Sequence, residues 1–126
     1  MKTRSLSESF RCAVHGVVFV FRTERNMMLH FFAAVLVLVV AALIEVTLLE
    51  FLCLILTISL VLICEMINTA LEILCDVICA GLEPRIKRIK DIAAGAVLIS
   101  AVSAVLVGGA VFGPRIILQI KWIFRI

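Results

Sequence analysis

The chain has 126 residues, of which 64% are hydrophobic and 17% are charged, with a formal net charge of +3. Its mean hydropathy of +1.26 is far above that of soluble domains, in which roughly half of the residues are apolar. This composition excludes a soluble domain and predicts a membrane protein. Because one helical crossing needs about 20 residues, the length allows one domain with a few spans.

Residues 5–22 precede the first long apolar segment and have the periodicity of an amphipathic helix. Their apolar side chains recur at steps of three and four residues, at Phe10, Val14, Val17, Val18 and Phe21. Such a helix lies on the membrane surface, where its arginines meet lipid phosphates. The alternative is that this segment forms the first turn of a long transmembrane helix.

Three apolar segments follow, and we expect them to span the membrane at about 27–44, 51–80 and 92–112. Each is long enough to cross, although the second must include a polar extension. The first begins too late and is too long for a cleavable signal peptide. The tail, 113–126, alternates basic and apolar residues, which indicates an interfacial helix. The predicted fold is all-α, a three-span transmembrane helical bundle with an N-terminal amphipathic surface helix.

The basic residues predict the orientation of the bundle. Lysines and arginines are found before the first span and between the second and third spans, whereas none separates the first from the second. Short basic segments stay on the cytoplasmic side of a membrane. We therefore expect a cytoplasmic N-terminus. Three later cations argue mildly against this topology, because they would lie outside: Arg115, Lys121 and Arg125.

The second span carries a line of polar residues in the sequence CEMINTALEILCD, Cys64 to Asp76. At 100° per residue, its three carboxylates and one amide fall within an arc of about 80° on one helix face. These side chains are Glu65, Asn68, Glu72 and Asp76. Like charges four residues apart repel each other and favour a compensating cation, and a hard oxygen site for magnesium would supply it.

The alternative for this polar line is that it joins helices in an oligomer. Such contacts usually use amides and hydroxyls, because an uncompensated carboxylate costs at least a few kcal/mol within the membrane. Three carboxylates therefore favour a functional site. The five cysteines show neither a zinc-binding spacing nor a disulfide framework.

Two further clusters lie at the expected cytoplasmic ends of the spans. Glu24, in RTERN, would alone be interpreted as part of a surface salt bridge. The basic sequence RIKRIKD, 85–91, is mostly explained by attraction to anionic lipids. Lys90 and Asp91 differ, because an acid at the mouth of an apolar helix indicates a function.

A carboxylate cluster that faces the cytoplasm, a nearby lysine and apolar surroundings suit phosphoryl transfer to a lipid alcohol. A metal ion held by the carboxylates would bridge the nucleotide phosphate oxygens, the lysine would neutralise developing charge, and a deep carboxylate would accept the hydroxyl proton. The sequence contains neither a P-loop nor a kinase-type glycine-rich loop. One alternative is a small proton or cation transporter or channel, although the carboxylates extend only from the middle to one side. Another is a catalytically inactive assembly protein, which would lack one of the carboxylates of the polar line; none is missing here.

Three motifs, RTERN (22–26), EMINTALEILCD (65–76) and KDIAAGAVLISAVSAVLVG (90–108), resemble the prokaryotic integral-membrane diacylglycerol kinase family. The TERN and KDxAAGAV sequences resemble those of its undecaprenol kinase branch. The resemblance implies a lipid kinase of the bacterial cytoplasmic (inner) membrane that transfers the γ-phosphate of Mg-ATP to undecaprenol or diacylglycerol. It also implies a homotrimer whose active sites are shared between subunits.

The resemblance further assigns roles to residues of this chain. Glu65 would be the general base, and Glu24 and Glu72 would hold Mg²⁺. Nucleotide contacts would come from Glu24, Glu72, Gly81, Leu82, Glu83, Lys90 and Asp91. The polar lining and the substrate contacts would come from Asn68, Asp76, Asn26, His30 and Ala94. The sequence LEPR, 82–85, between the second and third spans, differs from the sequence that members of the family often have there.

Overall fold

The computed structural model describes residues 5–78, 81 and 83–124, and within these ranges it contains helices and no strand. The helices are α1 (Leu6–Thr23), α2 (Arg25–Leu43), α3 (Leu48–Ile78) and α4 (Pro84–Phe124). Helices α2 and α3 and the segment Pro84–Leu118 of α4 are each long and apolar enough to cross a membrane. The prediction of an all-α, three-span bundle with an N-terminal helix is therefore confirmed.

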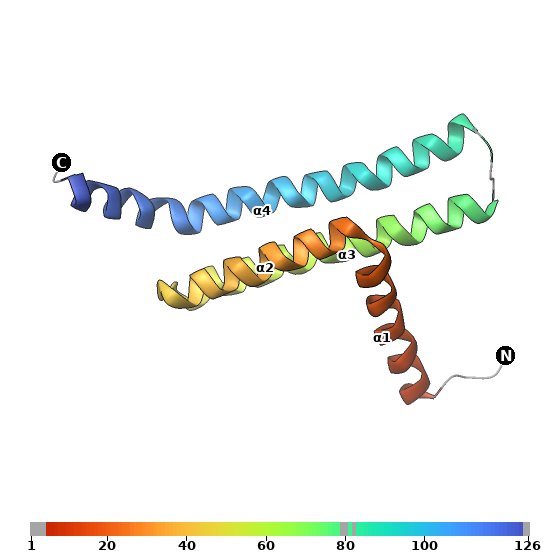
Figure 1. Ribbon diagram of the computed structural model, residues 1–126, viewed down its shortest axis with the longest axis horizontal. Coiled ribbons are helices and arrows are strands. Elements are labelled where there is room, and N and C mark those ends of the chain that lie inside the picture. Colours follow the sequence, from red (N-terminus) through yellow and green to blue (C-terminus); the bar gives the residue numbers. More distant parts are fainter. Residues whose placement is uncertain (1–4, 79–80, 82, 125–126) are drawn as a thin grey trace.

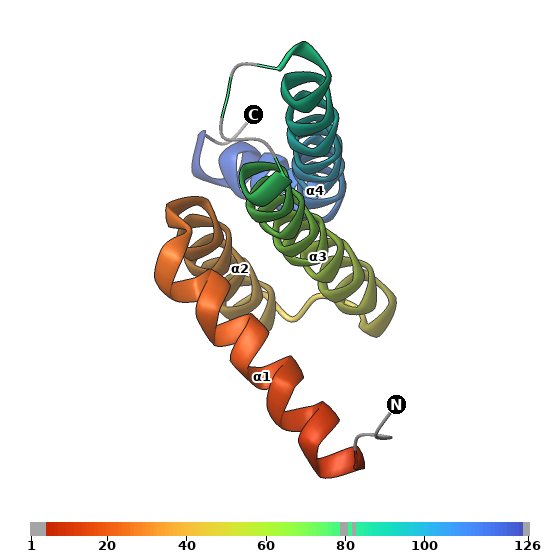
Figure 2. The same cartoon turned by 90° about the vertical axis from the view of Figure 1, so that its right-hand side faces the viewer.

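Helix α1 is separate from the first span. It begins with a capping box, in which Ser5 Oγ accepts from the Glu8 N–H and the Glu8 carboxylate accepts from the Ser5 N–H. It ends at Thr23, because Glu24 adopts an extended conformation (φ −103°, ψ 114°). As Figures 1 and 2 show, α1 then leaves the bundle at a steep angle. Residues 5–22 therefore do not extend the first span as one continuous helix.

The turn between α2 and α3 is short and closely hydrogen-bonded. The Val46 N–H donates to Ala41 O at 3.2 Å, as in a Schellman motif, and Glu45 between them has a left-handed φ of 52°. A left-handed conformation costs a residue with a side chain about 1–2 kcal/mol. Thr47 and Glu50 then form a second capping box at the start of α3.

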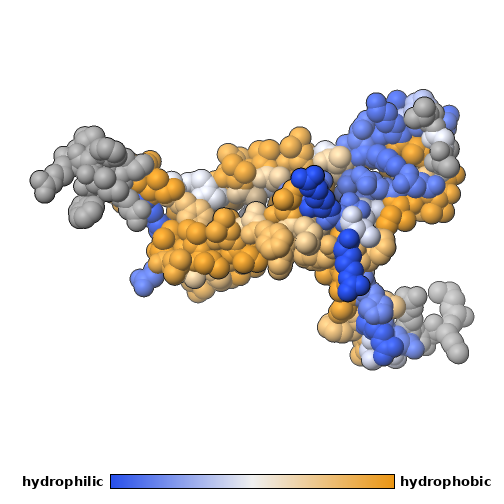
Figure 3. All heavy atoms as spheres, viewed as in Figure 1, coloured by the Kyte–Doolittle hydropathy of each residue, from blue (hydrophilic) through white to orange (hydrophobic). Residues whose placement is uncertain are grey.

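Helix α3 lies between α2 and α4 (Figure 2) and packs against both, most extensively against α4. Ala41, Leu54 and Val111, one from each of the three helices, form a buried apolar cluster near the α2–α3 turn. Most other large apolar side chains are exposed in the single chain. They form the hydrophobic belt of Figure 3, as expected of helices that meet lipid or other chains.

The bundle has two chemically different ends. We call the end with the α3–α4 connection and the start of α2 the basic end, and the end with the α2–α3 turn the turn end. Figure 3 shows hydrophilic residues concentrated toward the basic end and along α1.

Helix α4 is longer than the expected span at 92–112. It begins at Pro84, and proline is favoured at the first position of a helix, where its missing N–H costs nothing. It continues through Pro114 to Phe124, so residues 113–124 extend α4 rather than form a separate helix. The interfacial position of this tail, the surface position of α1 and the limits of the spans in lipid stay predictions.

Candidate active site

The polar line of α3 becomes more exposed from its first residue to its last. Glu65 is 2% exposed, Asn68 and Glu72 are partly buried, and the Asp76 side chain is 68% exposed. The line therefore connects a buried carboxylate with the surface of the basic end.

Glu65 lies against the first turns of α2. Asn26 and His30 both lie close enough to the Glu65 carboxyl to interact with it electrostatically. Asn26 and His30 are four residues apart and so share one face of α2. Glu24, at the break between α1 and α2, and Glu72, two turns along α3, also act on the Glu65 charge. The structure thus brings together five polar side chains that the sequence predicted for the site.

Asn68 has an incomplete set of hydrogen bonds. Its Nδ2 donates to Glu72 Oε1 at 3.1 Å. Its Oδ1 is buried and has no hydrogen-bond partner among the residues that the structure describes. Because buried polar atoms are nearly always paired, Oδ1 is an acceptor that a ligand, a metal ion or water would satisfy.

At the surface of the basic end, Lys90 Nζ of α4 donates to Asp76 Oδ1 of α3. The pair joins the two helices across the α3–α4 connection. The sequence predicted both residues for the site but did not predict their pairing. Asp91 and Ala94, one residue and one turn further along α4, are exposed.

The remaining predicted nucleotide contacts lie in the connection itself. The Glu83 N–H donates to Gly81 O at 3.0 Å, and Glu83 pairs with Arg85 at 3.7 Å. Leu82 lies outside the described residues. Among the described residues, no hydrogen bond or ion pair joins Glu83 or Asp91 to the carboxylates of α3, so the structure does not bring these two residues to the Glu65 cluster.

Two apolar grooves border the site, one at Asn68 of the polar line and the other at His30 of α2. One, of about 410 Å³ between α3 and α4, is lined by Cys64, Ile67, Asn68, Leu71, Ile89, Ile92, Ala93 and Ala96. The other, of about 380 Å³, lies among α2, α3 and α4, and His30 is its one ionisable lining residue. Grooves of this kind place an apolar chain beside a polar headgroup, as a membrane lipid requires.

One buried residue of the site was missed by the sequence analysis. Thr69 is 2% exposed and donates from Oγ1 to Glu65 O at 3.0 Å. Its position in the NTA sequence directly after Asn68 was the available signal. The hydroxyl donates to the backbone carbonyl one turn earlier, so this buried polar group is satisfied within α3 itself.

Comparisons with known proteins identify the family of the chain. The family model described as prokaryotic diacylglycerol kinase matches residues 11–112. A diacylglycerol kinase of Synechocystis sp. is 40% identical over 114 residues, which cover 90% of this chain and 65% of that protein. The chain thus spans slightly less than two thirds of that relative. An undecaprenol kinase of Bacillus subtilis is 36% identical over 114 residues, with 88% and 93% covered.

These matches confirm the family resemblance that the three motifs indicated, and they lend no support to a transporter or channel. The family model covers most of the chain, including the buried Glu65, the polar residues around it and most of the three spans. The chain therefore belongs to the prokaryotic diacylglycerol kinase family, a family of multi-pass membrane lipid kinases.

Proposed function

We propose that this chain transfers the γ-phosphate of ATP to the hydroxyl of a membrane lipid, either undecaprenol or diacylglycerol. The observation that best supports this is the position of Glu65. It is a carboxylate 2% exposed, beside Asn26 and His30, in a site bordered by one apolar groove at Asn68 and by another at His30. Glu65 is placed to meet a lipid hydroxyl that arrives from within the membrane.

In this proposal Glu65 is the general base. Its carboxylate accepts the proton of the lipid hydroxyl while the hydroxyl oxygen forms a bond to the γ-phosphorus and the bond from that phosphorus to ADP breaks. Asn26 orients the carboxylate from α2. The burial of Glu65 keeps water away from this carboxylate, which favours transfer to the lipid over hydrolysis.

Magnesium is the proposed metal, held by Glu24 and Glu72. Among the described residues, no group of three or more His, Cys, Asp and Glu side chains is arranged to hold a metal ion by itself. This suits magnesium, which commonly takes one or two carboxylates from the protein and the remaining ligands from water and nucleotide phosphates. The unpaired Asn68 Oδ1 next to Glu72 adds a further oxygen. When bound, the ion neutralises negative charge on the phosphates.

Lys90 and the α3–α4 connection are the proposed nucleotide contacts, with Gly81, Leu82, Glu83 and Asp91. Asp76 holds the Lys90 ammonium at the surface end of the polar line. A lysine in this position neutralises the charge that develops on the phosphates during transfer.

The lipid chain is proposed to pass over the aromatic residues at the junction of α1 and α2. Phe21 and Phe31 pack edge to face with centroids 5.1 Å apart, and Phe32 beside them is 62% exposed. Diacylglycerol and undecaprenol, the lipids for which the two relatives are named, each carry one hydroxyl on long apolar chains. We propose that both are phosphorylated, with a preference for undecaprenol, because the TERN and AAGAV motifs resemble that branch.

The chain is further proposed to act as a homotrimer in the bacterial inner membrane, with its active sites shared between subunits and its N-terminus in the cytoplasm. The abundance of exposed apolar side chains in the single chain supports further helix contacts. The basic residues at the basic end support its cytoplasmic position.

The test is transfer of labelled phosphate from ATP to each lipid in mixed micelles, with the purified full-length chain. We expect magnesium-dependent formation of a lipid phosphate. Absence of a phosphorylated product with both lipids, in a preparation that binds ATP, would contradict the proposed activity.

A further inference from the structure

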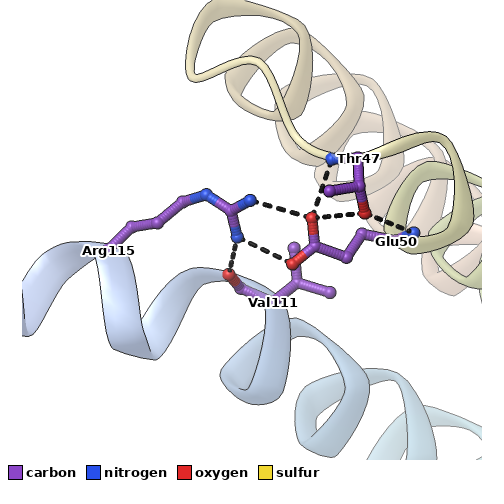
Figure 4. Close-up of polar contacts among 4 residues, drawn as sticks. All are labelled: Thr47, Glu50, Val111 and Arg115. Carbon is purple, nitrogen blue, oxygen red and sulfur yellow. Dashed lines mark hydrogen bonds and ion pairs between the residues drawn. The ribbon is translucent and has the colours of Figure 1, made fainter.

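Glu50 and Arg115 join α3 to α4 at the turn end, far from the candidate active site (Figure 4). Arg115 Nη1 donates to Glu50 Oε1 and Nη2 donates to Glu50 Oε2, each at 2.8 Å. Arg115 Nη1 also donates to Val111 O at 2.7 Å. Isolated surface ion pairs contribute little, but this pair forms two parallel bonds and its side chains are only 30% and 28% exposed.

Glu50 is also fixed within its own helix. The Thr47 N–H and Oγ1 both donate to Glu50 Oε2 at 2.8 Å, as Figure 4 shows. Directly beneath lies the buried cluster of Ala41, Leu54 and Val111. The Glu50 carboxylate therefore connects the α2–α3 turn, the start of α3 and the last third of α4.

The spacing of two ion pairs determines the register of α3 against α4. The pair of Asp76 and Lys90 joins the same helices at the basic end. From Glu50 to Asp76 is 76 − 50 = 26 residues, and from Lys90 to Arg115 is 115 − 90 = 25 residues. At about 1.5 Å per residue the two separations are about 39 and 38 Å, so both pairs form in one register of these antiparallel helices. A slide of one turn, about 5.4 Å, would separate both pairs.

Apolar packing and the two ion pairs act together on this register. Small side chains of α4, among them Ala93, Ala96, Ala101 and Ala104, line the grooves beside α3. In lipid, the hydrophobic effect does not drive apolar helices together, so packing and polar contacts between the helices determine how they associate. The polar pairs at the two ends therefore contribute directly to the register.

We propose that Glu50 and Arg115 are positioning residues for phosphoryl transfer. By fixing the register at the turn end, they set the position of the α3 carboxylates relative to Lys90 at the basic end. Glu50 lies 65 − 50 = 15 residues before Glu65, about 22 Å along the helix, so the pair acts without touching a substrate. This inference rests on the proposed function.

The first test compares Arg115→Gln with Lys121→Gln, a matched control that removes one positive charge from the exposed part of α4 beyond the same end. We expect Arg115→Gln to lower kcat by about 10-fold or more with little change in KM for ATP, because a displacement of about 1 Å can cost up to about 10²-fold. Arg115→Lys keeps the charge but loses the two parallel hydrogen bonds to Glu50, so its kcat should be intermediate. Lys121→Gln should match the unmodified chain.

Both glutamine variants remove a positive charge from the end opposite the basic end. By the positive-inside rule they reinforce the expected topology, so inverted insertion would not explain a loss. If Arg115→Gln does not fold, Arg115→Lys carries the comparison. A kcat of Arg115→Gln within about twofold of that of Lys121→Gln would overturn the proposal.

The second test measures the register without using activity. Spin labels are attached through Val77→Cys on α3 and Lys87→Cys on α4, both exposed positions at the basic end, in a chain whose own cysteines are replaced and which is diluted with unlabelled chains. We expect a shifted or broader distance distribution in Arg115→Gln but not in Lys121→Gln. Unchanged distances would overturn the proposal even if kcat fell. If the unmodified chain phosphorylated no lipid, the proposed function would fail while these distances still tested the register.

Discussion

The two ends of the bundle use glutamates in opposite ways. At the turn end, Glu50 accepts four hydrogen bonds, two from Thr47 and two from Arg115. At the basic end, Glu65 is nearly inaccessible, has three ionisable neighbours of which two are acidic, and lies one turn from an unpaired Asn68 Oδ1. The polar groups around Glu50 are thus paired within the chain, whereas those around Glu65 include an acceptor without a hydrogen-bond partner among the described residues.

This difference separates a structural carboxylate from a functional one in a very apolar protein. A carboxylate in or near lipid is costly unless it is paired. Glu50 offsets that cost with an arginine and two Thr47 donors. Among the described residues, the cluster of Glu24, Glu65 and Glu72 has no hydrogen bond or ion pair to a lysine or an arginine, which agrees with the proposal that its partners are a metal ion, a nucleotide and a lipid hydroxyl.

The largest expected effect is that of Glu65→Gln, which should lower kcat by about 10² to 10⁴-fold, because the amide keeps the shape of the side chain but does not accept a proton. ATP binding should change little. The matched control is Glu45→Gln, at an exposed carboxylate in the α2–α3 turn, which should retain normal kcat. Single-turnover rates with saturating lipid measure the difference, and a Glu65→Gln rate near that of the control would exclude Glu65 as the base.

The metal site is tested by Glu24→Ala and Glu72→Ala. Each should raise the magnesium concentration needed for half-maximal activity by at least about 10-fold, a loss known even for outer residues of metal sites. The double variant should be little worse than either single variant, because residues that hold one ion act as a unit. Titration with magnesium at fixed ATP measures this effect. Independent, additive losses would indicate separate roles for the two carboxylates.

The third prediction concerns the lipid that binds at the candidate active site of the basic end. Undecaprenol and diacylglycerol compete in mixed micelles at equal surface fraction, and the ratio of their kcat/KM values gives the preference. We expect a ratio of about 10-fold in favour of undecaprenol, since one methylene in an apolar pocket already contributes about 10-fold or more. A preference for diacylglycerol would refute the substrate assignment but not the kinase assignment.

Much of the basic end could be predicted from the sequence, because its pattern is local. The residues from Glu65 to Asp76 belong to one helix, so helical periodicity alone places them on one face. The spans follow from hydropathy over windows of about 20 residues. Both signals depend on neighbours in sequence, and the structure agrees with them.

The remaining features depend on contacts between distant segments or on backbone details. Glu50 and Arg115 are 65 residues apart, and the sequence analysis placed Arg115 outside the membrane without predicting a partner for it. That pairing accounts for Arg115, one of the three cations that argued against the predicted topology. The length of α4 was missed because the basic residues 85–90 lower the local hydropathy and Pro114 resembles a helix end, although a membrane helix tolerates proline.

The smallest expected effect separates the two functions of Glu50. Thr47→Ala removes the hydroxyl that donates to Glu50 Oε2 and accepts from the Glu50 N–H, but it leaves both Arg115 bonds in place. Loss of a helix cap typically costs about 1 kcal/mol of stability, so the Tm in detergent should fall by a few degrees. The kcat should stay within about twofold of the unmodified value, because the register of α3 against α4 depends on the interhelical pair. A Thr47→Ala variant with normal Tm but a kcat as low as that of Arg115→Gln would show that the cap, rather than the ion pair, positions the site.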